Sequence, residues 1–296
     1  MKYTGERFIP GEQGDIALEH YQRYMFARNL VAGKVVLDVG SGEGYGSYLL
    51  SQVAKNVIGI DVSEEAVKHA SSKYEGANVE YRNANCTDLE GVVDEGSVDV
   101  VVFFEALEHI DGESQAKALK EIKKALNEGG VLLISTPNKP VYNEMAGQEQ
   151  NIYHLNELTL AEFRGLLHNH FRLVKIFGQK VEIASFLWTA DLASGLPKTS
   201  CNLLSDDGPL IGSSLPEPDK ARYFIAVCSD NSVPLQLELD ILLYKEMKEV
   251  GHRDELIRLK DEYILHLETS LKNIYSSNSW KLTAPLRRLM GIFNKS

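Results

Sequence analysis

The stretch VLDVGSGEGYG, residues 36–46, decides the fold of this chain. Its apolar first half predicts a β-strand, and its glycines predict a tight turn that leads into a helix. Gly40, Gly42 and Gly44 permit positive φ angles and let a ligand approach the backbone closely. The dinucleotide fingerprint G-x-G-x-x-G needs glycine at position 45, which is a tyrosine here. Asp38 and Glu43 would repel a diphosphate, so the turn favours a ligand that carries positive charge.

Strand and helix patterns alternate after this turn. The predicted strands lie near 35–39, 57–60, 78–82, 98–104 and 131–135, with helices near 44–54, 64–74 and 114–127. Such alternation predicts a parallel sheet with helices on both faces. The glycines at 129 and 130 predict the end of the third of these helices. A helix near 159–167 follows, and strands at 173–177 and 223–227 are expected to form an antiparallel pair at the edge of the sheet.

The loop and the order of elements resemble the class I S-adenosylmethionine (SAM)-dependent methyltransferases, from the loop to about residue 180. The resemblance implies an α/β fold with a seven-stranded, Rossmann-like, doubly wound sheet, an N-terminal helical cap and a long C-terminal helix. It also implies an enzyme that binds SAM through Asp38, Gly40, Gly42 and Gly44. SAM carries a sulfonium, an ammonium and a ribose diol but no phosphate, which suits an acidic glycine turn.

Further SAM contacts follow from the same resemblance. Asp61 ends the second strand, where a carboxylate accepts both ribose hydroxyls, and Val62 follows it. Asp61 also lies beside Ser63 in a position to cap the next helix, and both roles are compatible. Asn85 and Cys86 stand where the family contacts adenine, although the family usually has an acid at the position of Asn85. A surface turn is the alternative for this pair.

A helix beginning near residue 19 resembles the leader of bacterial glycan methyltransferases. In that setting it closes over the cofactor, so Arg23 would meet the SAM carboxylate and Tyr21 or Tyr24 would line the methyl-transfer pocket. The alternative is an amphipathic helix that packs on the edge of the sheet.

The catalytic residues are expected directly after the strand at 98–104, at the carboxyl edge of the sheet. A helical turn there would put Glu105, Glu108 and His109 on one face. His109 is the expected general base, tuned by Glu105 or Glu108, and Glu105 is also a predicted cofactor contact. An alternative makes Glu105, Glu108, His109 and His154 a site for Mg²⁺ or Mn²⁺, a pattern similar to metal-using small-RNA and quinone methyltransferases. In a third reading, Glu105 caps the turn and His109 only packs.

Composition narrows the functional classes. The 296 residues have 44% hydrophobic content, enough for a full domain and an appendage. A net charge of −11 argues against bulk binding of nucleic acid. The cysteines, at 86, 201 and 228, have no disulfide or zinc spacing. No apolar leader or membrane-spanning run is present, so we expect a cytoplasmic protein, either free or peripheral at the inner face of the membrane.

Four parts are predicted: a cap at 1–33, the methyltransferase domain at 34–230, a long helix at 231–275 and a tail at 276–296. Residues 180–220 form an insertion, read as a substrate-side lid or a disordered loop. The apolar seam of the long helix is interrupted, as in a partial coiled coil that packs on the domain or in a homodimer. From 271 to 296 there are five Lys or Arg and no acid. This tail resembles an element of glycosyltransferases and polysaccharide-assembly proteins, and would dock on a membrane surface, a glycan-assembly partner or its own domain.

These resemblances together predict a SAM-dependent O-methyltransferase that acts on a sugar hydroxyl in surface polysaccharide, O-antigen, lipopolysaccharide or other glycan biosynthesis. A quinone or small-phenol O-methyltransferase is the second hypothesis. A non-catalytic SAM-binding scaffold within a glycan-assembly complex is the third.

Overall fold

A computed structural model describes residues 8–10, 14–146, 151–181, 203–205, 208–210 and 220–231. The chain divides into two units, Met1–Leu243 and Tyr244–Ser296. All of the second unit lies outside the described residues, as do the predicted tail, all but the first residue of the predicted long helix, and most of the predicted lid. Two short strands, β7 (Leu203–Ser205) and β8 (Gly208–Leu210), form an antiparallel pair within that lid segment, where no strands were expected.

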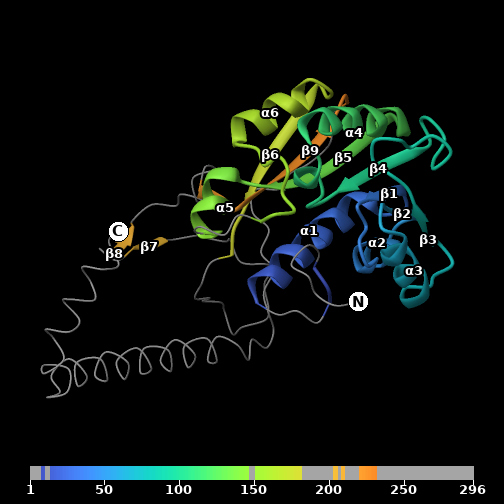
Figure 1. Cartoon of the computed structure of the whole chain (residues 1–296), viewed down its shortest axis with the longest axis horizontal. Coiled ribbons are helices and arrows are strands. Elements are labelled where there is room, and N and C mark those ends of the chain that lie inside the picture. Colours follow the sequence, from blue (N-terminus) through green and yellow to red (C-terminus); the bar gives the residue numbers. More distant parts are fainter. Residues whose placement is uncertain are drawn as a thin grey trace, which may run out of the picture. The chain divides into compact units, whose positions relative to one another are not determined.

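A seven-stranded mixed sheet forms the centre of the fold, in the order β3-β2-β1-β4-β5-β9-β6 (Figure 1). Five neighbouring strands are parallel: β1 (Val35–Val39), β2 (Asn56–Asp61), β3 (Val79–Asn83), β4 (Val98–Phe103) and β5 (Leu126–Pro137). β9 (Tyr223–Ser229) runs antiparallel to both β5 and β6 (Leu173–Gln179). The α/β class, the Rossmann-like sheet and the antiparallel edge pair are therefore confirmed.

The helices follow the alternation that the sequence predicts. They are α1 (Asp15–Val31), α2 (Tyr45–Ser51), α3 (Glu64–Lys73), the 3-10 turn η1 (Leu107–His109), α4 (Gly112–Ala125), α5 (Lys139–Ala146) and α6 (Leu160–His168). Helix α1 begins four residues before the expected start near residue 19, and α5 was not predicted. Within the described residues, no helix is long and apolar enough to cross a bilayer.

The expected end of a helix at Gly129 and Gly130 is wrong. Helix α4 ends at Ala125, and strand β5 already starts at Leu126, which pairs with Val98. A register irregularity separates that pair from the regular ladder further along. A Cβ on Gly130 would lie 2.8 Å from the Cβ of Leu126, so glycine is needed here because the backbone folds closely against that side chain.

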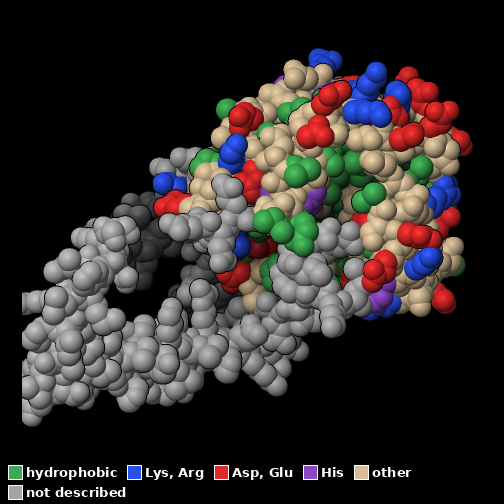
Figure 2. All heavy atoms as spheres, in the orientation of Figure 1, with side chains coloured by type: hydrophobic (Ala, Val, Ile, Leu, Met, Phe, Trp, Pro, Cys, Tyr) green, Lys and Arg blue, Asp and Glu red, His purple; other side chains and the backbone are tan. Residues whose placement is uncertain are grey.

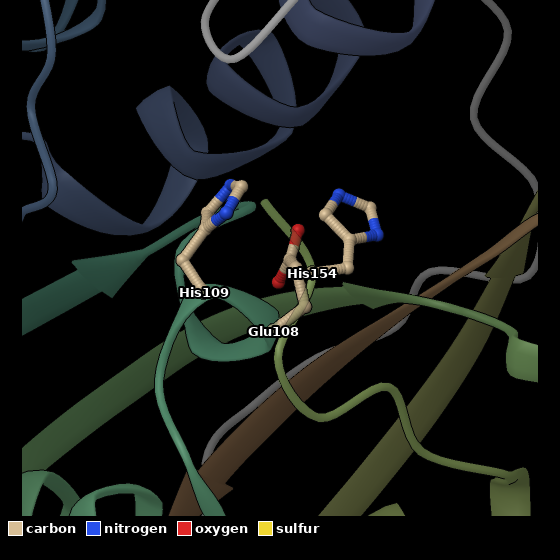
Figure 3. A group of neighbouring side chains, drawn as sticks. All are labelled: Glu108, His109 and His154. Carbon is tan, nitrogen blue, oxygen red and sulfur yellow. The ribbon is translucent and has the colours of Figure 1, made fainter. Parts of the chain in front are cut away.

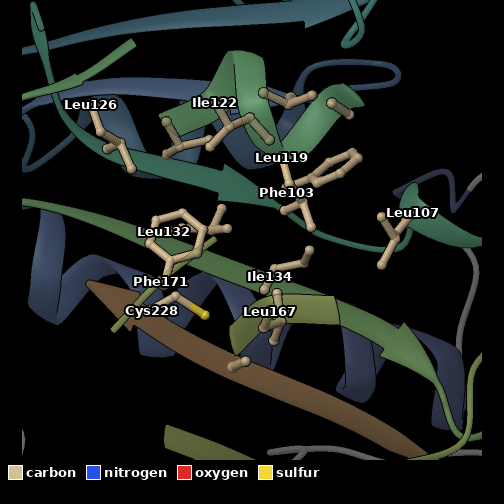
Figure 4. Close-up of a cluster of buried hydrophobic side chains, with 14 of the residues drawn as sticks. Phe103, Leu107, Leu119, Ile122, Leu126, Leu132, Ile134, Leu167, Phe171 and Cys228 are labelled. Carbon is tan, nitrogen blue, oxygen red and sulfur yellow. The ribbon is translucent and has the colours of Figure 1, made fainter. Parts of the chain in front are cut away.

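Alternate residues of the central strands supply two separate cores, because successive side chains point to opposite faces of a sheet. Leu37, Val101 and Phe103 pack on the face covered by α4 and α6. Figure 4 shows Phe103 in this core with Leu119 and Ile122 of α4 and Leu167 of α6. Val36, Val100 and Val102 pack on the other face, against α1 and α2. With both faces covered, ligands can reach the sheet at the carboxyl ends of its strands, where β1, β2 and β4 lead into the predicted functional residues.

Candidate functional site

The glycine turn between β1 and α2 has the backbone that its sequence predicts. Gly40, Gly42 and Gly44 have φ angles of 72°, 54° and 93°, which side chains rarely tolerate. A Cβ on Gly40 would lie 2.8 Å from that of Ala106, and a Cβ on Gly44 would lie 2.6 Å from that of Ala70. The turn therefore depends on glycine for space as well as for conformation, and it touches the segment that follows β4.

The two carboxylates of the turn are buried and have protein partners. Glu43, 1% exposed, accepts hydrogen bonds from Lys73 and Tyr74 and lies 3.0 Å from His69 Nε2. Donors from α3 and the residue after it therefore surround the carboxylate of Glu43 within the protein. Asp38 accepts a 2.6 Å hydrogen bond from Ser47 Oγ. Burial raises the pKa of Asp38 to about 7 against the lowering effect of its hydrogen bonds.

Asp61 connects the end of β2 to the glycine turn. Its Oδ2 accepts from the backbone N–H of Gly42 at 2.9 Å, and its Oδ1 accepts from that of Ser63 at 2.8 Å. The side chain of Ser63 accepts from Ala66 N and caps α3, so the cap belongs to Ser63. A carboxylate accepts several hydrogen bonds at once, which suits a ribose diol. Both roles proposed for Asp61, local and ligand-binding, are compatible with this geometry.

The predicted adenine side is partly a surface turn. Asn85 uses its amide oxygen to accept from the N–H and the hydroxyl of Thr87, each at 3.0 Å, which favours the turn. Cys86 is half-buried, and burial raises the pKa of its thiol to about 11, so it stays neutral. Val62 is 71% exposed. Asn83 was not singled out from sequence, yet its amide donates to the carbonyl oxygens of Asp61 and Val62 and fixes that segment.

Three of the four predicted metal ligands come together. Glu108, His109 and His154 each have one ligand atom within 4.8 Å of the others. The side chains of Glu108 and His109 project from the turn after β4, and that of His154 from a separate segment, toward a common space (Figure 3). Glu105 is outside this group, because the helical turn covers 107–109 only and Glu105 has a φ of 48°. Its Oε1 accepts from Ser135 Oγ at 2.7 Å. The expected face shared by Glu105, Glu108 and His109 is therefore wrong.

Hydrogen-bond contacts orient both histidine rings of this cluster. His109 Nδ1 lies 2.9 Å from the carbonyl oxygen of Tyr153, which can only accept, so this nitrogen carries the proton. The neutral ring then has its lone pair on Nε2. His154 Nδ1 lies 2.5 Å from Glu157 Oε1. Metal-binding histidines are commonly oriented in this way by a carbonyl or a carboxylate.

Glu108 is the buried carboxylate of the cluster, at 1% exposure. Burial raises its pKa well above the ordinary value, and the nearby charge of Glu105 adds to the effect. Its Oε2 has no hydrogen-bond partner within the described part of the chain. A buried carboxyl oxygen of this kind is costly unless a proton, a cation or a substrate hydroxyl engages it.

Arg23 joins the N-terminal helix to this region. It is 1% exposed, donates from Nη1 to Gln179 Oε1 at 2.8 Å, and lies 3.8 Å from Glu105 Oε1. Its guanidinium stacks over the ring of Tyr223 at 4.9 Å. Its Nη2 is buried and has no partner among the described residues. The role of Arg23 at a SAM carboxylate remains a prediction, and this buried donor is compatible with it.

The neighbouring tyrosines on α1 pack into an aromatic cluster. Tyr24 directs its hydroxyl to Asp38 at 3.4 Å and packs edge-on against Phe104, whereas Tyr21 packs against Phe8 and Tyr45. Helix α1 packs beside α2 on a face of the sheet and not on its edge, and it buries Glu19 and Arg23, so the alternative of an amphipathic helix on the sheet edge is wrong. The same packing brings Arg23 to Glu105.

Comparisons with known proteins agree with this geometry. Residues 37–134 match the family model described as a methyltransferase domain. The chain is 39% identical over 169 residues to a probable S-adenosylmethionine-dependent methyltransferase of Mycolicibacterium smegmatis, covering 56% of this chain and 63% of that protein. It is 35% identical over 120 residues to a ubiquinone biosynthesis O-methyltransferase of Idiomarina loihiensis, covering 39% of this chain and 47% of that one. The chain thus spans less than two thirds of the length of these curated relatives.

A crystal structure of a SAM-dependent methyltransferase from Archaeoglobus fulgidus shares the fold. Its TM-score is 0.50 at 16% identity, over 72% of this chain and 93% of that one. At such low identity the likeness supports the fold alone.

Proposed function

We propose that this chain, which carries a class I SAM-dependent methyltransferase domain, transfers a methyl group from SAM to a hydroxyl oxygen of a glycan. The observation that carries the proposal is the position of the Glu108–His109–His154 cluster beside the glycine turn. Strands β1 and β4 are parallel neighbours, and Gly40 of the turn abuts Ala106, two residues before Glu108. Donor and acceptor would therefore meet where these two strands end.

The residues at the turn fit SAM. Glycine conformations at 40, 42 and 44 bring the backbone within reach of a ligand, and Asp61 supplies oxygens for the ribose diol. The hydroxyls of Ser41, in the turn, and Thr136, near the end of β5, are buried and have no partner within the described residues, so polar contacts remain open there. Arg23 Nη2 is the matching donor for the carboxylate of the methionine part. SAM supplies a methyl carbon activated by its sulfonium.

The tasks left to the protein are alignment and proton removal. Alignment alone contributes up to about 7–11 kcal/mol in well-oriented reactions. A sugar hydroxyl is a weak nucleophile until a base accepts its proton. His109 fits the role of base, because the carbonyl oxygen of Tyr153 holds the proton on Nδ1 and leaves the lone pair on Nε2. Glu108 lies within the same cluster to stabilise the imidazolium that forms.

A divalent cation is the second way to activate the acceptor. Glu108, His109 and His154 offer one oxygen and two nitrogens, a donor set that suits Mn²⁺ better than Mg²⁺, which prefers oxygen alone. When bound, such a cation would lower the pKa of an acceptor hydroxyl. Glu157 and the carbonyl of Tyr153 already orient the two rings. Glu105, included in the set expected from sequence, would not be a ligand.

The class of acceptor rests on sequence resemblance. The N-terminal helix, the residues after β4 and the C-terminal tail are similar to those of bacterial glycan methyltransferases and polysaccharide-assembly proteins. The similarity to ubiquinone biosynthesis O-methyltransferases supports a phenolic acceptor as the runner-up. A SAM-binding scaffold without turnover is the non-enzymatic alternative. Docking through residues 276–296 to a membrane or a glycan-assembly partner, the homodimer and the cytoplasmic location stay predictions.

Substrate screening with the full chain tests the proposal. Methyl-labelled SAM is incubated with nucleotide sugars, lipid-linked oligosaccharides and polysaccharide, and in parallel with catechols and quinols. We expect label on a sugar with the wild-type protein and no label with His109→Ala. In a strain that lacks the protein, mass spectrometry of the surface glycan should show a loss of fourteen daltons for each residue that is normally methylated. Label on a phenol alone would select the runner-up. SAM binding without turnover on any acceptor would contradict enzymatic activity, and full activity after exhaustive EDTA treatment would exclude the cation.

A further inference from the structure

One amide side chain bridges the two segments that carry the cluster. Gln115 lies on α4 and is 1% exposed. Its Nε2 donates to the carbonyl oxygens of Leu107 and Asn156, each at 2.9 Å. Its Oε1 accepts from Asn156 Nδ2, also at 2.9 Å. Both donors of this amide are therefore used, one on the turn that contains Glu108 and His109, and one on the segment that contains His154.

Backbone hydrogen bonds join the same two segments. The N–H groups of Leu155 and Asn156 donate to the carbonyl oxygen of Glu108, at 2.8 and 3.1 Å. The ring of His109 is held by the carbonyl of Tyr153. As a result the rings of His109 and His154, which are 45 positions apart in the chain, have centroids 5.1 Å apart. Gln115 braces this junction from the side of α4.

We propose that Gln115 is a positioning residue, which with Asn156 sets the separation of His109 and His154 and thereby the geometry of the donor cluster. The effect of this positioning on methyl transfer or metal binding rests on the proposed function. The positioning itself is a property of the protein without ligands. The side chain acts through the two histidines and does not itself touch substrate.

The geometry requires an amide at this position. Leu107 and Asn156 present carbonyl oxygens, which need donors, while Asn156 Nδ2 needs an acceptor. Glutamate has the same shape but would set an oxygen against both carbonyls, and methionine fills the space without any polar contact. Helix α4 would persist in either variant, because the Asp111 cap and its apolar face hold it independently.

Nuclear magnetic resonance of the ligand-free full chain, with labelled histidine, tests the positioning directly. We expect Gln115→Met and Gln115→Glu to shift the ring signals of His109 and His154 and to weaken the Overhauser contact between them. The ring of His69, which pairs with Glu43, should not move. Unchanged signals from His109 and His154 in a folded Gln115→Met protein would overturn the proposal.

Asn78→Asp is the matched control. Its amide donates to the carbonyl oxygens of Ser51 and Ala54, at 2.8 and 3.1 Å. It lies next to the start of β3, an edge strand that β2 and β1 separate from β4. The same exchange of an amide for an acid is therefore made away from the candidate site. We expect it to leave the signals of His109 and His154 in place. If Asn78→Asp shifts them as much as Gln115→Glu does, the effect is general and the proposal fails.

Mn²⁺ binding supplies a second readout that separates this inference from the proposed function. Measured by electron paramagnetic resonance, the affinity of Gln115→Met for Mn²⁺ should be at least about tenfold lower than that of the wild-type protein, as is usual when a group that orients a ligand is lost. Its affinity for SAM should be unchanged. Mn²⁺ affinity equal to wild type would overturn the positioning role even if the metal site stands. If the wild-type protein binds no Mn²⁺, the metal hypothesis fails, and the ring signals alone decide the role of Gln115.

Discussion

The glycine turn and the Glu108–His109–His154 cluster lie side by side at the carboxyl edge of the sheet but are built differently. The turn is one continuous stretch of sequence, and its conformation follows from glycines whose φ angles are positive. The cluster draws on a turn after β4 and on a segment more than forty residues later, held together by hydrogen bonds of Gln115 and Asn156. The backbone conformation of a continuous motif can be predicted from its own residues, whereas the geometry of a discontinuous site depends on contacts that form only on folding.

The charges of the two regions are also handled differently. In the turn, donors from α3 and the residue after it surround Glu43, and at the end of β1 hydroxyl groups contact Asp38, so both carboxyl groups are already engaged by the protein. In the cluster, Glu108 keeps a buried oxygen without a partner among the described residues. We therefore expect substitutions in the turn to act on stability, and those of its glycines also on SAM affinity, whereas substitutions in the cluster should act on turnover.

The largest effect is expected for Gly44→Ala. The alanine would have to keep a φ near 93°, and its Cβ would lie 2.6 Å from the Cβ of Ala70. Strain and overpacking together cost about 2–6 kcal/mol in the free energy of unfolding, measured by urea denaturation, and should weaken SAM binding at least tenfold. Gly33→Ala is the control, since Gly33 has a φ of 70° and open space for a Cβ. Equal losses in the two variants would mean that space at Gly44 is unimportant.

Glu108→Gln should break the cluster and spare the turn. The amide is nearly isosteric, but unlike a carboxyl group it cannot ionise when an imidazolium or a cation forms beside it. We expect kcat to fall by about 10²–10³, a loss on the scale seen when one charged catalytic group is removed, while the SAM dissociation constant stays within twofold. Glu113→Gln, exposed in the first turn of α4, is the control. Wild-type kcat in Glu108→Gln would remove the cluster from the chemistry.

Glu43→Gln should lower stability without weakening SAM binding. Replacing a buried carboxylate that is engaged by Lys73, Tyr74 and His69 costs about 1–3 kcal/mol of unfolding free energy. Because this carboxylate is directed to α3, the affinity for SAM should hardly change once the protein is folded. Calorimetry with SAM and urea denaturation measure the two quantities separately. Weak SAM binding at unchanged stability would contradict this and point to a contact between Glu43 and the cofactor.

A pH dependence of stability is expected from Asp38. Its pKa is raised from an ordinary 3.8 to about 7 in the folded protein, first of all by burial. Between these values the folded state keeps a proton that the unfolded state has lost, so the contribution of Asp38 to stability falls as the pH rises from about 4 to 7. The slope between these two values is about 1.4 kcal/mol per pH unit.

Asp38→Asn removes this titration. Relative to wild type, the variant should therefore gain stability between pH 5 and 7, as followed by urea denaturation without SAM. A difference between the two proteins that is independent of pH would show that Asp38 stays ionised in the fold.

Local rules were sufficient to predict the central sheet, the glycine turn and the position of Asp61, because each depends on short spacings. They failed at Leu126, where pairing with Val98 extends β5 in place of a helix end, and at Glu105, whose positive φ turns it to Ser135. Asn83 and Gln115 were missed for the same physical reason. The role of a buried amide depends on the carbonyl groups to which it donates, and for these two residues those groups lie elsewhere in the chain.

Calorimetric titration with SAM, and with NAD⁺ for comparison, tests the central claim most directly: the turn after β1 holds SAM beside the acceptor cluster. We predict saturable binding of one SAM per chain, weakened by Asp61→Asn, and no binding of NAD⁺. Absence of heat with SAM together with saturation by NAD⁺ would contradict the claim.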